Sequence, residues 1–266
     1  MAFKSADKAC PEGRLRLSYR HMDRIFENQE TGRYEAWLDT TSGRAYLRSS
    51  RALLDRVLDW RRGWRILDVG CGLGVHLEHL KERGLLLTGL EAGPVMARLA
   101  AQRLGPQVDI DLGDAHDLPY EDNSFDAVIL VNTLELVDRR AQVLAEAARV
   151  AASRVCLITL NTFSPSGLFH LSLPHRHPLH RGRPLSLMAL WRLVREVLGP
   201  VPQAWAGALT WPGPAVGHWP FGPLVGVCAA VTPRFATRPL LVQTKPSAKP
   251  VRPIPSHGRV VLHRVK

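Results

Sequence analysis

Residues 67–74 read Leu-Asp-Val-Gly-Cys-Gly-Leu-Gly, and their three alternate glycines join a strand-like run to a helix-like run. The apolar run at 65–70 is typical of a buried parallel strand, and Leu77 and Leu80 have helical spacing. Glycine allows a sharp turn and lets a ligand approach the backbone closely. The first turn of the helix offers unpaired N–H groups. The segment therefore predicts a strand–turn–helix site for a carboxylate or a phosphate.

Strand-like and helix-like runs alternate through the middle of the chain. Helical runs separate five expected strands, at 65–70, 85–91, 108–114, 127–131 and 154–160. This rhythm predicts an α/β fold with a parallel sheet and right-handed crossovers. A helix at 186–198 and strand-like runs at 204–211 and 224–231 follow.

The composition divides the chain into three expected parts. Residues 1–60 form an N-terminal helical cap or lid, and 61–233 form the main domain, in which 162–184 is a substrate-side insertion. Residues 234–266 carry eight basic side chains, no acid and several prolines, so we expect a basic disordered tail.

Two acids follow strand-like runs at positions that suit a nucleoside. Glu91 ends the second expected strand, 17 residues after Gly74, where a carboxylate can accept both hydroxyls of a ribose. Asp114 ends the third, where an acid can accept from an adenine amine. Dinucleotide sites use similar glycine turns, so a nucleotide-dependent oxidoreductase is a rival hypothesis. The segments Gly113-Asp-Ala115 and Ser124-Phe-Asp-Ala-Val128 argue against it.

Four segments together resemble the class I methyltransferases of the methyltransferase type 11 group, which includes ubiquinone and menaquinone biosynthesis methyltransferases. They stand in the family's order, at 67–74, 89–91, 113–119 and 123–128. The resemblance implies a Rossmann-like α/β fold: a mostly parallel seven-stranded sheet, helices on both faces and a C-terminal antiparallel hairpin. It also implies S-adenosylmethionine as cofactor, and transfer of its methyl group to a small-molecule acceptor.

The resemblance also implies roles for single residues. The glycines would cradle the methionine part of the cofactor, Asp68 would orient its amino group through water, and Glu91 would hold the ribose. Asp114 would bind the adenine amine, and the carbonyl of Asn132 would lie near the reactive methyl. The expected cofactor-binding residues are Asp68, Gly70, Gly72, Gly74, Glu91, Ala92, Asp114, Ala115 and Asn132.

The acceptor is less well defined. Quinone-type relatives often carry a His pair after the fourth strand, whereas this chain has Glu135 there, so a quinone acceptor does not follow. Tyr34 and Trp37 resemble a segment of some uncharacterised bacterial relatives, and they either form a lid over the cofactor or pack on the core.

Four histidines fall within eleven residues, at His170, His175, His177 and His180. Clustered imidazoles can bind zinc, but no Cys, Asp or Glu accompanies them, so we expect a polar insertion and no metal site. A histidine could act as general base for a hydroxyl acceptor. The candidate catalytic residues are His170, His175, His177 and Glu135.

The net charge of +11 is unevenly distributed. Residues 1–138 carry a balance of −4, and residues 139–266 a balance of +15. The basic half leaves an alternative function open, in which the fold is a binding module that docks on nucleic acid or on an anionic membrane surface.

The cysteines are scattered, and none stands in a Cys-x-x-Cys pair. We expect Cys10, Cys71, Cys156 and Cys228 to be thiols of a reducing compartment. The sequence shows neither a secretory signal nor an apolar run of roughly 20 residues, so a cytoplasmic location is expected.

Deletion of the residues after Gln243 tests the expected tail. We expect the melting temperature and the affinity for S-adenosylmethionine to stay unchanged, because this segment cannot bury enough apolar surface to offset its ordering entropy. A large drop in melting temperature would contradict this prediction. A loss of turnover that depends on salt would instead indicate that the tail recruits substrate.

Overall fold

The structure is a computed structural model that describes residues 28–164, 182–209 and 215–233. The chain divides into two units, Met1–Arg234 and Phe235–Lys266, and all described residues belong to the first. Within the described ranges, no helix is both long and apolar enough to cross a membrane. The predictions for the basic tail and for residues 165–181 lie outside the described residues.

One mixed sheet carries the functional region, with the strand order β3-β2-β1-β4-β5-β8-β6-β7. The first five strands of this order are parallel, whereas β8 is antiparallel to β5, and β6 is antiparallel to β8 and β7. The strands are β1 (Arg65–Val69), β2 (Leu86–Glu91), β3 (Asp109–Leu112), β4 (Phe125–Val131), β5 (Ala151–Leu160), β6 (Gln203–Leu209), β7 (Ala215–Gly217) and β8 (Leu224–Ala230).

The expected mostly parallel sheet with an antiparallel C-terminal part is confirmed, but the expected count of seven strands is wrong. Within the described ranges the sheet has eight strands, because β7 pairs with the end of β6 through Gly207 and Gly217. The sequence around β7 is a short loop rich in Pro, Gly and Trp, and three residues are too few to show the alternation that predicts a strand.

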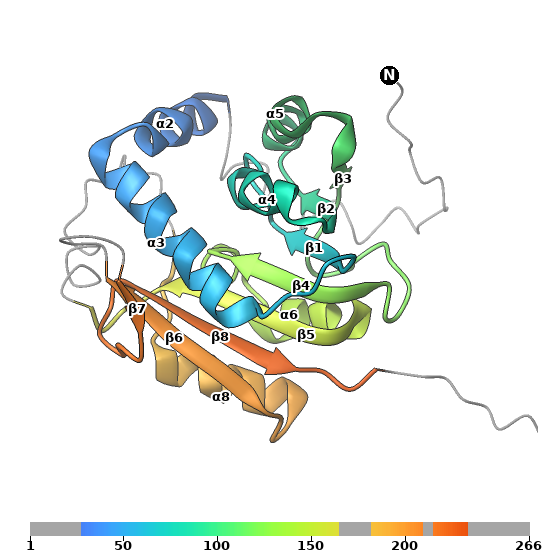
Figure 1. Ribbon diagram of the computed structural model, residues 1–266, viewed down its shortest axis with the longest axis vertical. Helices are drawn as coiled ribbons and strands as arrows, with labels where there is room; N and C mark the ends of the chain where they lie inside the picture. Colours follow the sequence, from blue (N-terminus) through green and yellow to red (C-terminus); the bar gives the residue numbers. More distant parts are fainter. Residues whose placement is uncertain (1–27, 165–181, 210–214, 234–266) are drawn as a thin grey trace, which may run out of the picture. The chain divides into compact units, whose positions relative to one another are not determined.

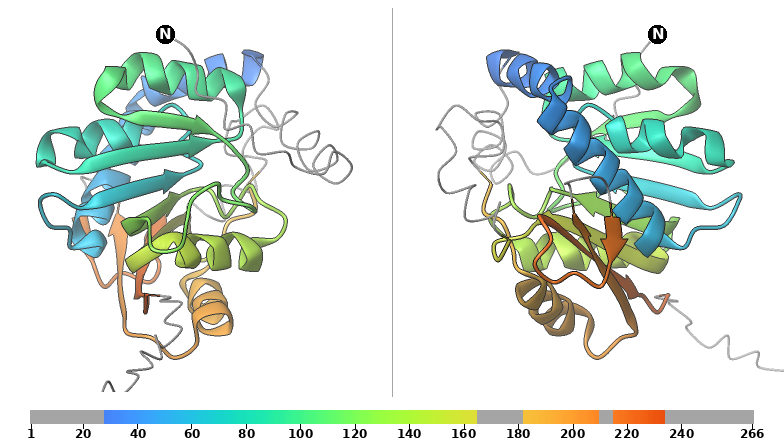
Figure 2. Two further views of the ribbon diagram at one scale, coloured as in Figure 1. Left: turned by 90° about the vertical axis from the view of Figure 1, so that its right-hand side faces the viewer. Right: turned by 60° about the vertical axis from the view of Figure 1, so that its left-hand side comes forward.

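Helices cover both faces of the sheet (Figures 1 and 2). In β4, Ala127 and Ile129 belong to the core under α3, α4 and α5, while Val128 and Leu130 face α6 and α8. This alternation follows from the two-residue period of a strand, and it explains why the sequence of β4 is continuously apolar. The helices are α2 (Asn28–Leu38), α3 (Thr41–Leu58), α4 (Val75–Leu80), α5 (Pro94–Leu104), α6 (Arg140–Val150) and α8 (Leu187–Leu198).

Helix α3 joins the N-terminal segment to the sheet. The hydroxyl of Thr40 caps its first turn by accepting a hydrogen bond from the N–H of Gly43. Its apolar stripe includes the fully buried Leu53 and Leu54, and the helix packs on β5, β6 and β8 (Figure 2). Of the helical segment expected at residues 1–60, the described part contains the helices α2 and α3.

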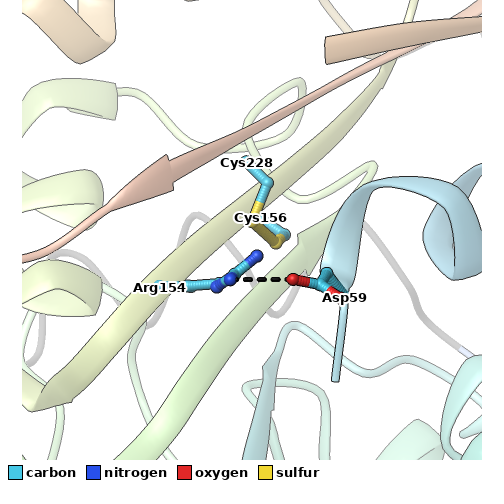
Figure 3. Close-up of a disulfide and its surroundings, with 4 residues drawn as sticks. All are labelled: Asp59, Arg154, Cys156 and Cys228. Atoms are coloured by element: carbon cyan, nitrogen blue, oxygen red, sulfur yellow. Dashed lines mark ion pairs between the residues drawn. A yellow bond between two sulfur atoms is a disulfide. The ribbon is translucent and has the colours of Figure 1, made fainter. Parts of the chain in front are cut away.

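Cys156 and Cys228 form a disulfide between β5 and β8, so the expectation of free thiols is wrong for this pair (Figure 3). The antiparallel register of the two strands places the two residues opposite each other. Their separation of 72 residues hides that register from the sequence. Nearby, Arg154 of β5 pairs with Asp59 after α3, with 2.9 Å between the side-chain nitrogen and oxygen.

Leu53→Ala tests the packing of α3 on the sheet. We expect the free energy of unfolding to fall by about 2–5 kcal/mol, because a fully buried leucine would leave a cavity against β8. Arg56→Ala is the matched control on the exposed side of the same helix, and it should change stability by less than about 0.5 kcal/mol. Urea unfolding measures both, and equal effects would mean that α3 does not pack as described.

Candidate functional site

A cavity lies where β1, β2 and β4 end. Its wall is formed by the turn after β1, the segment 90–93 after β2, the segment 131–137 after β4, and side chains of α2 and α3. The empty space, its open mouth included, is about 1200 Å³. The carboxyl ends of parallel strands are the usual place for a ligand in open α/β sheets.

The three glycines of the turn are not all required for the same reason. Gly70, Gly72 and Gly74 have φ angles of 74°, 56° and 73°, in the left-handed region. A Cβ on Gly70 would lie 2.7 Å from Thr133, and one on Gly74 would lie 2.7 Å from Leu104. A Cβ on Gly72 would meet nothing closer than the sulfur of Met96 at 4.0 Å. The fold thus needs Gly70 and Gly74, whereas Gly72 leaves space beside the cavity.

Asp68 is a buried carboxylate without a partner among the described residues. Its side chain is only 1% exposed, it lines the cavity, and neither carboxylate oxygen has a hydrogen bond. Burial, followed by the nearby charge of Glu91, raises the pKa of Asp68 from 3.8 to about 8. An ionised carboxylate in this position requires a donor or a cation from a ligand.

Glu91 joins the glycine turn to the segment after β2 through hydrogen bonds. Its Oε2 accepts from the N–H of Gly72 at 2.9 Å, and its Oε1 accepts from the N–H of Gly93 at 2.8 Å. Burial raises the pKa of Glu91, and the bonds from the two amides lower it in part. A carboxylate offers about four lone-pair sites, so each oxygen can still accept from a ligand hydroxyl.

The segment after β3 only partly matches the expectation. Gly113 and Ala115 line the cavity, but Asp114 is not among the lining residues. The Oδ1 of Asp114 accepts from the backbone N–H of His116 at 2.9 Å, and the ring Nδ1 of His116 lies 2.7 Å from it. The two neighbours of Asp114 therefore line the cavity, whereas its own carboxylate bonds to His116.

Asn132 connects the end of β4 to helix α3. Its φ of 55° is unusual for a residue other than glycine, and its N–H donates to the carbonyl of Ile158. The hydroxyl of Tyr46 donates to Asn132 Oδ1 at 2.6 Å, and Asn132 Nδ2 donates to Glu135 Oε1 at 2.7 Å. These bonds fix the Asn132 side chain in the wall of the cavity.

Glu135 lies deeper in the same wall and is 3% exposed. Besides Asn132, its Oε1 accepts from the hydroxyl of Thr159 at 2.6 Å and from the N–H of Leu160 at 2.8 Å. Its Oε2 is buried and has no hydrogen-bond partner among the described residues. Burial raises the pKa of Glu135, and the bonds from its neighbours lower it in part.

Tyr34 and Trp37 both pack against the core, as one of the two interpretations expected, and a lid over the cofactor stays a prediction. Tyr34 lines the cavity, while Trp37 packs against the core and contacts Tyr46, with 5.3 Å between ring centroids. Tyr34 stacks on Trp37 at 5.9 Å. Burial raises the pKa of Tyr34 to about 12, so its hydroxyl stays protonated at neutral pH.

Tyr46 and His76 are cavity residues that the sequence did not indicate. Tyr46 lies on α3, which packs on the sheet far from the turn in sequence, whereas His76 lies on α4 and follows the glycine turn directly. His76 Nε2 lies 3.0 Å from the hydroxyl of Ser50, and burial lowers its pKa to about 3, so the ring is neutral. No sequence motif marks either residue.

The candidate histidines His170, His175, His177 and His180 lie outside the described residues. In the part of the chain that the structure describes, no group of three or more His, Cys, Asp and Glu side chains is arranged to hold a metal ion. Of the four candidate catalytic residues, the structure places only Glu135.

The sequence of residues 67–158 matches the methyltransferase domain family. Among curated proteins, ajmaline N-methyltransferase of Rauvolfia serpentina is 35% identical over 102 residues, which cover 36% of this chain and 35% of that protein. The chain thus spans about a third of the length of that relative.

Two solved structures show the same fold. A Thermotoga maritima S-adenosylmethionine-dependent methyltransferase, described as a possible histamine N-methyltransferase, has a TM-score of 0.67 and 23% identity, covering 79% of this chain and 99% of that one. Magnesium protoporphyrin IX methyltransferase from Synechocystis, solved with bound S-adenosylhomocysteine, has a TM-score of 0.60 and 17% identity, covering 80% and 99%. The described residues therefore have the fold of the S-adenosylmethionine-dependent class I methyltransferases, and residues 67–158 match the methyltransferase domain family.

Proposed function

We propose that this chain transfers the methyl group of S-adenosylmethionine to a small-molecule acceptor in the cavity at the ends of β1, β2 and β4. A shared fold does not by itself establish an activity, so the proposal rests on the site. The observation that carries it is the buried carboxylate of Asp68, which has no hydrogen-bond partner among the described residues and lines the cavity beside the glycine turn.

The residues at this end of the cavity suit the cofactor. The turn 70–74 would bind the carboxylate of its methionine part, and Asp68 would bind the ammonium, directly or through water. Glu91 would accept from the ribose hydroxyls with the lone pairs that the two backbone amides leave. Ala92 and Ala115, which line the cavity, would face the nucleoside.

The proposed cofactor contacts of two further residues are less direct. The carbonyl of Asn132 is proposed to lie near the methionine ammonium, and its left-handed backbone places the residue in the cavity wall. The carboxylate of Asp114 already bonds to His116, so it would have to break these bonds to contact the adenine. Ala115, which lines the cavity, is therefore the better supported contact in this segment.

The bound cofactor supplies an electrophilic methyl group on a sulfonium. The protein then needs mainly to hold an acceptor in line with that group and to exclude water. Tyr34, Tyr46 and Leu160 line the rest of the cavity and serve both needs. The alternative of a docking module for nucleic acid or membranes has no support from the described residues or the relatives.

The named N-methyltransferases among the similar proteins make nitrogen a reasonable acceptor atom. Ajmaline N-methyltransferase and the possible histamine N-methyltransferase both carry that chemistry in their names. Each is similar to this chain only over part of its length or at low identity, so we bring their chemistry to this chain as a proposal.

Asp68→Asn tests the proposed ammonium contact. A folded-state pKa of about 8 against an ordinary value of 3.8 means that Asp68 favours folding fully below about pH 4, and this contribution is lost as the pH rises towards 8. We therefore expect the variant without cofactor to be more stable than the wild type by about 1–3 kcal/mol at pH 8, and by less at pH 5. Its affinity for S-adenosylmethionine should fall by a similar free energy.

Urea unfolding at the two pH values and calorimetry with S-adenosylmethionine measure these effects. Asp39→Asn, the same change at an exposed position, should alter neither quantity. Unchanged cofactor affinity in Asp68→Asn would remove Asp68 from the site, whatever happens to stability.

Gly72→Ala tests whether the turn holds the cofactor. The left-handed φ should cost about 1–2 kcal/mol of stability, and the added methyl would occupy space that we assign to the ligand. Gly63→Ala is the control, because Gly63 has a φ of 80° and open space around it but lies outside the cavity lining.

Calorimetry compares both variants with the wild type, using S-adenosylmethionine and NAD as ligands. We expect the wild type and Gly63→Ala to bind S-adenosylmethionine and not NAD, and Gly72→Ala to lose that binding. Binding of NAD would favour the oxidoreductase hypothesis instead, and equal affinity of the two variants would show that the ligand does not approach the turn.

A further inference from the structure

Several side chains of the cavity wall make none of the proposed cofactor contacts, and we call this part of the wall the acceptor end. It consists of the side chains of Tyr34, Tyr46, Asn132, Glu135 and Leu160, which all line the cavity. Two tyrosines and a leucine give this end an apolar wall, while Asn132 and Glu135 are its polar groups. The acceptor end therefore suits a molecule with an apolar body and one polar group.

The described residues of the cavity wall include three acids and no base that is charged at neutral pH. Asp68, Glu91 and Glu135 line the cavity, and no Lys or Arg of the described residues does. Among the described residues, His76 is the one histidine that lines the cavity, and its ring is neutral because burial lowers its pKa to about 3. An anionic acceptor would meet like charges in this wall, whereas a cation would be attracted to it.

Of the three acids that line the cavity, Glu135 is the one to which we assign no contact with the cofactor. Its Oε1 is saturated by Asn132, Thr159 and the N–H of Leu160, which hold the carboxylate in one orientation. Its Oε2 is buried and lacks a hydrogen-bond donor among the described residues. A buried carboxylate oxygen without a donor is costly, and a ligand that donates to it would relieve that cost.

The other groups around Glu135 do not neutralise this oxygen. The hydroxyl of Tyr46 donates to Asn132. The guanidinium of Arg140 donates to the carbonyls of Leu134 and Arg183, and it interacts with Glu135 only through its charge. No guanidinium of the described residues forms an ion pair with Glu135 within 4.0 Å.

We propose that the acceptor is a primary or secondary amine with an apolar body, and that Glu135 Oε2 binds its ammonium group and then takes its proton. This inference rests on the proposed methyl transfer. The aromatic rings of Tyr34 and Tyr46 add a favourable surface for a cation. The raised pKa of Glu135 suits a carboxylate that accepts a proton.

The proposed reaction balances without a further reactant. One N–H proton moves from the ammonium to Glu135 Oε2, which leaves a neutral amine with a free lone pair. The nitrogen forms a bond to the methyl carbon as the carbon–sulfur bond breaks, and the electron pair of that bond stays on sulfur. The products are a methylated ammonium and S-adenosylhomocysteine, and Glu135 then releases its proton to solvent.

Two matched series of probes test the acceptor class. Tryptamine, tryptophol and indole-3-acetate share one apolar body and differ in an amine, a hydroxyl and a carboxylate, and the phenylethyl analogues repeat the comparison. Calorimetry measures their affinity for the full chain loaded with S-adenosylhomocysteine. We expect the amines to bind about 10- to 100-fold more tightly than the alcohols, and the carboxylates to bind most weakly.

Glu135→Gln assigns any preference to this residue. The amide oxygen can keep the three bonds of Oε1, while an N–H₂ group replaces Oε2, so the variant should fold and bind S-adenosylhomocysteine as the wild type does. The amine preference should disappear, and methylation of tryptamine should fall by a similar factor. Glu82→Gln makes the same change at an exposed position and should retain the preference.

The outcomes separate this inference from the proposed function. If the chain does not bind S-adenosylhomocysteine, the proposed function fails first. If it binds the cofactor product but takes alcohols or carboxylates as well as amines, or binds no amine in the millimolar range, the amine inference is overturned. Retention of the amine preference in Glu135→Gln overturns the role of Glu135.

Discussion

The close packing of the turn after β1 is the constraint on which the site depends. Gly70 lies against Thr133, and Gly74 lies against Leu104, so closely that neither position has room for a Cβ. These two contacts tie β1 to the end of β4 and to α5, and Glu91 adds a third tie through the N–H of Gly72. The cavity therefore has walls from three strands whose relative positions are fixed by backbone contact, and a ligand meets a largely preformed surface.

This preformed surface has a cost in stability. Asp68 and Glu135 are both buried, and each has at least one oxygen that no described residue satisfies. Burial of an unpaired polar group opposes folding, and an apolar core around the same strands offsets it. Local groups that weaken the fold and face a cavity are expected where a protein binds a ligand that completes them. Both carboxylates line the cavity, Asp68 beside the glycine turn and Glu135 in the part that we call the acceptor end.

The sequence predicted features that depend on neighbours in the chain. The strands and the helix α5 followed from apolar runs and from Pro94 and Gly105 at the helix ends, and the glycine turn followed from its own residues. It could not predict features that depend on register between distant segments. The Cys156–Cys228 disulfide needs the pairing of β5 with β8, and Tyr46 reaches Asn132 across 86 positions. Asp114 shows a third limit, because a local turn bonds its carboxylate to His116.

The two ends of the cavity also differ in what the family resemblance can predict. Asp68, the glycines and Glu91 all lie within the matched residues 67–158, so the family relationship bears directly on the cofactor end. The acceptor end is assembled differently: Tyr34 and Tyr46 come before the matched region and Leu160 comes after it. Only Asn132 and Glu135 belong to both the matched region and the acceptor end. A relative can therefore share the cofactor site in full and still surround its acceptor with other side chains. For this reason the acceptor has to be inferred from the charge and hydrogen bonding of this chain's own residues, such as the buried Glu135 Oε2, which has no hydrogen-bond partner among the described residues.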